Sequence, residues 1–403
     1  MIFDRWACRT EVRAGHGVTA AVLARLPLGR RPVLVVDEVL AERAHGVRRD
    51  LASLHVETVP STWSGTDSVA ALTERMAALR CTAVVGLGGG STLDLVKLAC
   101  LAAADPRTLP LLRARSPRSG LILLPSVPPS APAPTGPLRV LVPTTVGTGA
   151  EASAVACLPS PQGKRLVSGE QLRPDIAVLD SAHTKTLPRE LLAEGVLEAL
   201  LRVVGSALGE EPGLPHADDA AVGLVVRLAE AGERLLNGDA TAEVRLTTAW
   251  LSTTTHTGWA LAGRPPYAAK HWYLANELST VLGVRKMTAT AAILPAVWQR
   301  IRDGDRRFGD ARRLRIVWSW VRTTLPDLPI DPVEGITALV LRWRLETPSP
   351  TTAAVLDRAT RRAVASWGGR LPMLGGVSHA DIRSLFAQAL CMPSPDWEPE
   401  RLT

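Results

Sequence analysis

The segment GLGGGSTLDLVK (86–97) decides the fold class, because it joins a predicted strand to a predicted helix. The apolar run TAVVG (82–86) in front of it predicts a β-strand, and LDLVKLACLAA (93–103) behind it predicts an α-helix. Glycines in such a turn let the backbone approach a pyrophosphate, and the helix N-terminus presents free N–H groups to it. A glycine turn alone is also common as a plain tight turn, so the interpretation depends on other parts of the chain.

A second turn with similar chemistry follows later in the chain. The run RVLVPTT (139–145) predicts another strand, and it leads into PTTVGTGAEAS (143–153). The threonine hydroxyls and backbone N–H groups of this turn are suited to hold a phosphate or a ribose. The two turns together favour a nucleotide cofactor over two unrelated loops.

The first half of the chain alternates predicted strands with predicted helices. Further strands are predicted at VLVVDE (33–38), HVETVP (55–60) and DIAVLD (175–180), and a helix at SVAALTERMAAL (68–79). This alternation is typical of a parallel, doubly wound sheet. Residues 114–138 are rich in Pro and Ser and predict a long loop, in which LILLP is either a strand or a flap.

The second half predicts only helices. From about Leu187, apolar residues recur at helical spacing, as in 189–208, 217–236 and 242–261. We therefore expect two domains, residues 1–183 with the sheet and residues 184–403 all helical.

Composition limits the possible partners and compartments. The chain has 403 residues, a net charge of +7 and five widely spaced cysteines without a CxxC motif. The positive charge is spread out, which argues against nucleic-acid binding. We see no signal peptide and no apolar run long enough for a membrane span, so we expect a cytoplasmic protein with free thiols.

The motifs GGGS-x-x-D-x-x-K (88–97) and PTT-x-GTG-x-E (143–151) resemble those of the iron-containing alcohol dehydrogenase and dehydroquinate synthase superfamily. The resemblance covers most of the chain and is strongest at 82–180. It implies an N-terminal Rossmann-like domain that binds NAD, an all-α C-terminal domain, and hydride transfer in the cleft between them. Members of the family are often homodimers.

The resemblance also implies the cofactor residues. Asp37 matches the acidic residue that bonds the adenosine ribose, which favours NAD over NADP because a carboxylate repels a 2′-phosphate. Lys164 matches a lysine that contacts the cofactor ribose. The other matching positions are Gly88, Gly89, Gly90, Ser91, Asp94, Thr144, Thr145 and Thr148.

The metal ligands of the family are replaced in this sequence. The resemblance places its Asp and His ligands on Glu198 and Arg202, and its other two His ligands on Trp272 and Lys286. A further histidine near the nicotinamide is replaced by Asn276. Arginine stays protonated and is not a metal ligand, so we expect no metal. A shift of one residue would instead bring His271 into the site.

Several interpretations of this change stay open. Glu198 and Arg202 are suited to pair along one helix. In an active enzyme, Lys286 would stabilise or deprotonate the reacting hydroxyl, and Arg202 would bind a substrate carboxylate. The alternatives are a conventional metal-dependent alcohol dehydrogenase, a cyclase like dehydroquinate synthase, and a non-catalytic scaffold.

One specific hypothesis concerns the substrate, which we expect to be a small molecule or a peptide. Divergent relatives resemble the dehydrogenase of daptide-type (RiPP) peptide biosynthesis. That resemblance implies oxidation of a peptide's C-terminal threonine at its β-carbon, followed by loss of carbon dioxide. An arginine for the carboxylate and a lysine at the hydroxyl suit this chemistry.

Overall fold

The computed structural model describes residues 8–42, 47, 54–126, 136–209, 214 and 216–390. The centre of the predicted Pro/Ser-rich loop, residues 127–135, lies outside the described residues.

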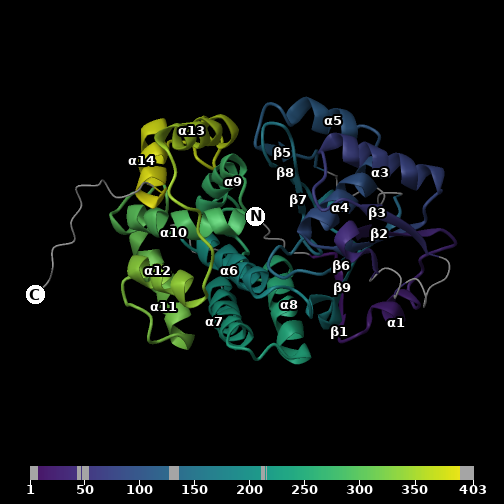
Figure 1. Ribbon diagram of the computed structural model, residues 1–403, viewed down its shortest axis with the longest axis horizontal. Coiled ribbons are helices and arrows are strands. Elements are labelled where there is room, and N and C mark those ends of the chain that lie inside the picture. The colour runs from purple at the N-terminus through teal and green to yellow at the C-terminus, as the bar shows by residue number, and fades with distance from the viewer. Residues whose placement is uncertain are drawn as a thin grey trace, which may run out of the picture.

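A six-stranded parallel sheet forms the N-terminal half, as the alternating pattern predicts (Figure 1). All its neighbouring strands run parallel. In sheet order, the strands are β1 (Glu11–Gly15), β9 (Ile176–Asp180), β6 (Leu138–Pro143), β4 (Ala83–Gly88), β2 (Pro32–Asp37) and β3 (His55–Val59). The α/β class expected for this half is therefore confirmed.

Both faces of the sheet are covered, which explains why its central strands are continuously apolar. Along β2, Val33 and Val35 pack into one hydrophobic core, and Leu34 and Val36 pack into another on the opposite face. Helix α4 packs against β4, β6 and β7, and its residues from Thr92 to Ala102 are all buried. The helices and 3-10 segments of this half are α1 (Thr19–Leu23), η1 (Glu38–Leu40), α3 (Thr66–Ala78), α4 (Gly90–Ala104), α5 (Thr108–Arg115), η2 (Glu170–Leu172) and η3 (Ser181–Thr184).

A smaller sheet lies beside the first. It contains β5 (Leu121–Leu123), β8 (Arg165–Ser168) and β7 (Val155–Leu158), with β8 in the middle. Strand β5 shows that the LILLP segment of the predicted loop is a strand. The sequence patterns predicted neither β7 nor β8, although both strands contribute to the site.

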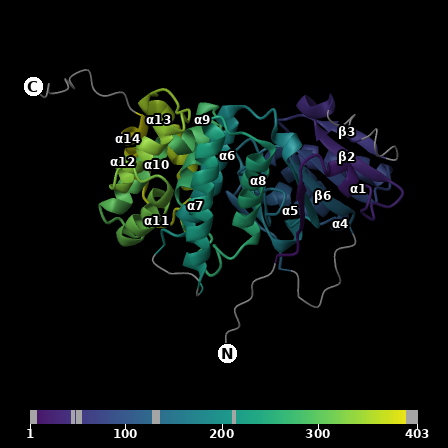
Figure 2. The ribbon, with the colours of Figure 1, turned by 90° about the horizontal axis from the view of Figure 1, so that it is seen from below.

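The C-terminal half is entirely helical among the described residues, and the predicted helices at 189–208, 217–236 and 242–261 are all present. Figures 1 and 2 both show α6 to α14 gathered on one side of the molecule, with the strands on the other. One large core joins these helices, and it includes Trp298 and Trp318 packed edge to face. The helices are α6 (Arg189–Ser206), α7 (Ala217–Leu236), α8 (Ala242–Thr257), α9 (His271–Leu282), α10 (Lys286–Arg302), α11 (Ala311–Thr324), α12 (Pro332–Arg342), α13 (Ala353–Trp367) and α14 (His379–Leu390).

Within the described part of the chain, no helix is both long and apolar enough to cross a membrane.

Candidate active site

The two predicted cofactor turns lie side by side at the carboxyl edge of the sheet. Strand β4 ends at Gly88 and strand β6 at Pro143, and the Thr144 amide donates to the Gly88 carbonyl at 2.9 Å. A Cβ on Gly90 would lie 2.9 Å from Thr148 Cγ2, so only glycine fits there without displacing the second turn. Because Gly89 caps α4 without any side-chain hydrogen bond, the first N–H groups of that helix remain available to a ligand.

A buried hydroxyl in the second turn has no partner. Among the described residues, Thr145 Oγ1 is shielded from solvent and makes no hydrogen bond. Buried polar atoms without a partner are rare in folded proteins, so Thr145 indicates a ligand. With the glycine turn and the free end of α4, this hydroxyl fits the phosphate and ribose groups of a dinucleotide.

Asp37 and Ser91 lie at the same edge, but both already have protein partners. The Asp37 carboxylate accepts from Ser61 Oγ at 2.6 Å, from the Val39 amide at 3.1 Å and from Thr92 Oγ1 at 3.3 Å. Ser91 Oγ accepts from the Trp63 indole at 2.9 Å. The position of Asp37 at the end of β2 agrees with a role at the adenosine ribose, and that role stays a prediction.

Asp94 and Lys97 form a buried pair behind the first turn. Lys97 is fully buried, and its ammonium lies 2.9 Å from Asp94 Oδ1 and 3.1 Å from Ser153 Oγ. Burial raises the pKa of Asp94, and the charge of Lys97 opposes that shift. The Cys157 amide donates to Asp94 at 2.9 Å. This pair therefore joins α4 to β7.

The second turn also packs against the helical half. Gly147 has a φ of +99°, and a Cβ there would lie 2.3 Å from the Gly195 carbonyl oxygen of α6. The Gly147 amide donates to Ser252 Oγ on α8 at 2.9 Å. These contacts bring the cofactor turns close to the α6 face that carries Glu198 and Arg202.

Lys286 and Glu198 form a close ion pair in this region. The Lys286 ammonium lies 2.5 Å from Glu198 Oε1 and 4.8 Å from the centre of the Trp272 ring. Burial alone would lower the pKa of Lys286, but attraction to Glu198 outweighs burial and raises it. Burial alone would raise the pKa of Glu198, but the charges of Lys286 and Arg202 outweigh burial and lower it. Both groups are therefore charged at neutral pH.

Arg202 is held mainly by the second turn and α8. Its guanidinium donates to Thr255 Oγ1 at 3.0 Å and to the Thr148 carbonyl at 3.2 Å, and it lies 3.9 Å from Glu198. The predicted pairing of Glu198 with Arg202 is therefore secondary to the pairing with Lys286. Two of the guanidinium nitrogens are already in use, which weakens the expectation that Arg202 binds a substrate carboxylate.

Comparison with known sequences and structures also indicates a similarity to the iron-containing alcohol dehydrogenases. The profile of the family described as iron-containing alcohol dehydrogenase matches residues 9–181. The N-terminal half of the chain is therefore similar to this family. The whole chain shares that fold: it superposes on NADH-dependent butanol dehydrogenase A from Thermotoga maritima with a TM-score of 0.77, at 17% identity over 96% of this chain and 98% of the other.

Two curated relatives match parts of the chain. The NADPH-dependent aldehyde reductase YqhD of Escherichia coli is 28% identical over 227 residues, which is 56% of each chain. A phosphonoacetaldehyde reductase of Streptomyces viridochromogenes is 38% identical over 141 residues, or 33% of each chain. The match thus covers about half of the length of the aldehyde reductase and about one third of the length of the phosphonoacetaldehyde reductase.

The donor set at the metal-ligand positions does not fit a transition metal. Lysine and arginine are cations, and the tryptophan indole has only a donor, so Glu198 alone offers a ligand atom. That carboxylate already bonds Lys286. Among the described residues, no three His, Cys, Asp or Glu side chains are grouped so that they would hold a metal ion.

Two histidines with buried Nε2 atoms, His256 and His271, do not form a metal-binding group with other described residues. His271 Nε2 and His256 Nε2 are buried without a hydrogen bond among the described residues. Burial, together with the charge of Lys286, lowers the pKa of His271 to about 3, so its ring is neutral. Its ring packs against Gly205 and Trp272.

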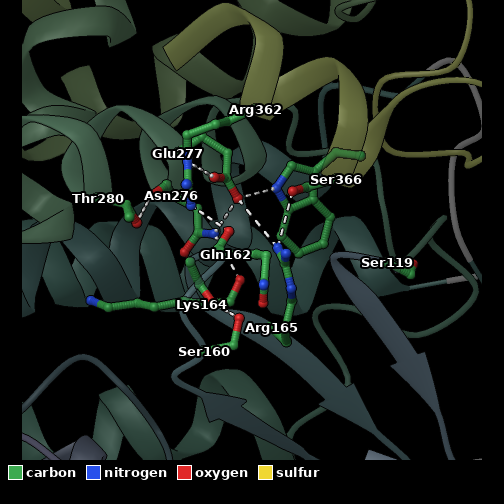
Figure 3. A network of polar contacts seen from close by, with 12 residues as sticks. Ser119, Ser160, Gln162, Lys164, Arg165, Asn276, Glu277, Thr280, Arg362 and Ser366 are labelled. Atoms are coloured by element: carbon green, nitrogen blue, oxygen red, sulfur yellow. Dashed lines mark hydrogen bonds and ion pairs between the residues drawn. The ribbon is translucent and has the colours of Figure 1, made fainter. Parts of the chain in front are cut away.

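The side-chain amide of Asn276 already has protein partners. Its amide donates to the Lys164 carbonyl at 3.1 Å and to Glu277 Oε1 at 3.1 Å. Figure 3 shows these residues within a larger polar network, with the Lys164 side chain directed away from it. Asn276 therefore holds the segment that carries Lys164.

Sequence reasoning missed several residues around this site. Burial raises the pKa of the Cys157 thiol on β7, which lies close enough to Lys286, Lys164 and Glu198 for their charges to affect that pKa. Glu277 bonds several residues of the network in Figure 3. Neither residue belongs to a motif, and the strands that would have indicated them were not predicted. Glu151, the last residue of the motif PTT-x-GTG-x-E, could have been chosen from that motif, and it accepts a 2.6 Å hydrogen bond from Thr253.

Proposed function

We propose that this chain is a nicotinamide-dependent oxidoreductase that interconverts a carbonyl and an alcohol without a metal ion. The Lys286–Glu198 pair is the observation that carries the proposal, because it puts an ammonium at a position where the family resemblance expects a histidine ligand. When bound, the nicotinamide donates or accepts the hydride. Asp37 at the end of β2 favours NAD over NADP.

In this proposal, Lys286 stabilises the negative charge that develops on the substrate oxygen. Its raised pKa keeps it protonated, so it donates a hydrogen bond rather than acting as a base at neutral pH. In carbonyl reduction, the ammonium also supplies the proton that the alkoxide takes up. The Trp272 ring, whose centre lies 4.8 Å from the ammonium, adds a cation–π attraction that helps to hold the ammonium in place.

We further propose an anionic substrate. Two cations, Arg202 and Lys286, stand beside Glu198 at positions where the family resemblance expects metal ligands. The similarity to a phosphonoacetaldehyde reductase supports an aldehyde that carries an anionic group.

The test is turnover of NADH and NADPH with phosphonoacetaldehyde, and with propionaldehyde as an uncharged control. We expect NADH oxidation with a kcat/KM at least about tenfold higher for the anionic aldehyde, the scale of one charge-assisted hydrogen bond. Binding of NADH without turnover of any carbonyl would indicate a scaffold instead.

Oxidation of a peptide's C-terminal threonine is a second candidate. An ammonium at Lys286 would also stabilise the enolate that forms when a β-keto acid loses carbon dioxide. Incubation with NAD and a peptide ending in Thr should then release carbon dioxide and NADH. Failure of the cognate peptide to react would rule out this candidate while leaving the carbonyl reductase proposal intact.

A further inference from the structure

A fully buried carboxylate lies between the two halves of the molecule, and it does not belong to the Lys286–Glu198 pair. Glu277, on α9, is 0% exposed. Its Oε2 accepts from Arg362 Nε at 3.0 Å, and its Oε1 accepts from Trp367 Nε1 at 3.0 Å, both on α13. From the N-terminal half, Arg165 Nη1 approaches Oε1 to 3.9 Å (Figure 3).

The network around Glu277 holds the turn that precedes β8. Arg362 donates to the Gln162 carbonyl, and Asn276 donates to the Lys164 carbonyl at 3.1 Å. Arg165 donates to the Ser116 carbonyl at 2.7 Å and to Ser366 Oγ at 3.0 Å. The carbonyls of Gln162 and Lys164 thus each accept one hydrogen bond, and the Arg165 side chain donates two.

Gly163 shows how closely this turn approaches the network. Its φ is +105°, and a Cβ there would lie 2.3 Å from Arg362 Nη2 and 3.2 Å from Glu277 Oε2. The backbone therefore lies directly against the charged groups. A shift of these groups would move the turn with them.

The Lys164 side chain leaves this turn on the opposite side, as Figure 3 shows. It lines a cavity of about 200 Å³ together with Ser160 and Thr280. Its charge also acts on Glu198 and Cys157. The network therefore fixes the backbone of the lysine that the family resemblance places at the cofactor ribose.

We propose that Glu277 and Arg362 are positioning residues for Lys164, and that they set its ammonium for the nicotinamide cofactor without touching the cofactor themselves. This inference rests on the proposed function. Arg362 then affects cofactor binding only indirectly, by positioning Lys164.

A double-mutant cycle on NADH binding tests this inference. The variants are Arg362→Met, Lys164→Met and the double variant, and NADH binding is followed by energy transfer from tryptophan. Arg362, whose side chain is 25% accessible, is replaced rather than Glu277, because Glu277 is fully buried. We expect each single substitution to weaken binding about tenfold and the double variant to be within about twofold of Lys164→Met, because contacting or linked sites are not additive.

Two controls separate positioning from general stability. Arg383→Met removes a comparable ion pair, with Asp357 on α13, and should leave NADH binding unchanged. Arg362→Lys keeps the charge but loses the planar fork, so it should weaken binding nearly as much as Arg362→Met. It also serves as the test variant if Arg362→Met does not fold.

The outcomes are distinct. Additive effects, or an unchanged dissociation constant in Arg362→Met, would overturn the positioning role while leaving the proposed function in place. A wild-type protein that does not bind NADH would overturn both proposals together.

Discussion

At the residue scale, Lys286 carries most of the chemistry proposed here. The ammonium is bonded to Glu198 and lies over Trp272, so it is held in one place by a charge and an aromatic face. The sequence indicated the replaced ligand positions but not which groups pair. Arg202 is the helical neighbour of Glu198, whereas Lys286 comes from a helix 88 residues away in the chain and is the closer partner.

Replacement of Lys286 by Met should lower kcat for carbonyl reduction by about 10²–10³-fold, the usual effect of removing one donor to a developing oxyanion. Steady-state kinetics with NADH measures this change. Lys185→Met, at an exposed lysine, is the matched control and should leave kcat unchanged. Near-wild-type kcat in Lys286→Met would remove Lys286 from the mechanism.

The pH dependence follows from the same pair. Glu198 has a lowered pKa, so its stabilising charge is present above its ordinary value of 4.5 and is lost only as pH falls through the lowered pKa. Lys286 has a raised pKa, so its contribution is present below 10.5 and is lost only as pH rises through the raised pKa. We expect kcat/KM for reduction to be flat between roughly pH 6 and pH 9. A rise through one ionisation near neutrality would instead indicate a neutral lysine acting as a base.

At the scale of elements, the second cofactor turn connects the sheet to the helices. It follows β6 and packs against α6 and α8 through Gly147. Strong patterns, such as the apolar β2 and β4 and the long periodic helices, could be predicted from the sequence. Strands β7 and β8 could not, because each has four residues, and β8 begins with the buried charge of Arg165.

Gly147→Ala should destabilise the protein more than a comparable change at an open glycine. Its Cβ would collide with the Gly195 carbonyl, so we expect the free energy of unfolding to fall by at least about 3 kcal/mol. Gly238→Ala is the control, because Gly238 has a similar φ of +96° and open space around it, and we expect a loss of about 1–2 kcal/mol there. Denaturant unfolding measures the free energy of unfolding of both variants. Equal decreases in the two variants would show that α6 shifts to accommodate the new Cβ without loss of stability.

At the scale of the whole molecule, a half with a parallel sheet and an all-helical half meet at the site. The fold class and the order of the halves could be predicted from periodicity and the glycine motifs. The interface between the halves could not, since contacts such as Glu277 with Arg165 and Arg362 join residues far apart in the chain without any sequence signature. The central claim, that the Lys286–Glu198 pair takes the place of a metal ion, also belongs to this scale.

The most direct test of that claim is elemental analysis of active protein purified without chelators. Our account predicts less than about a tenth of an equivalent of iron, zinc or other transition metal per chain, with activity unchanged by a chelator, because a lysine and an arginine at ligand positions leave no site to hold the metal. About one tightly held equivalent, whose removal abolishes activity, would contradict the account.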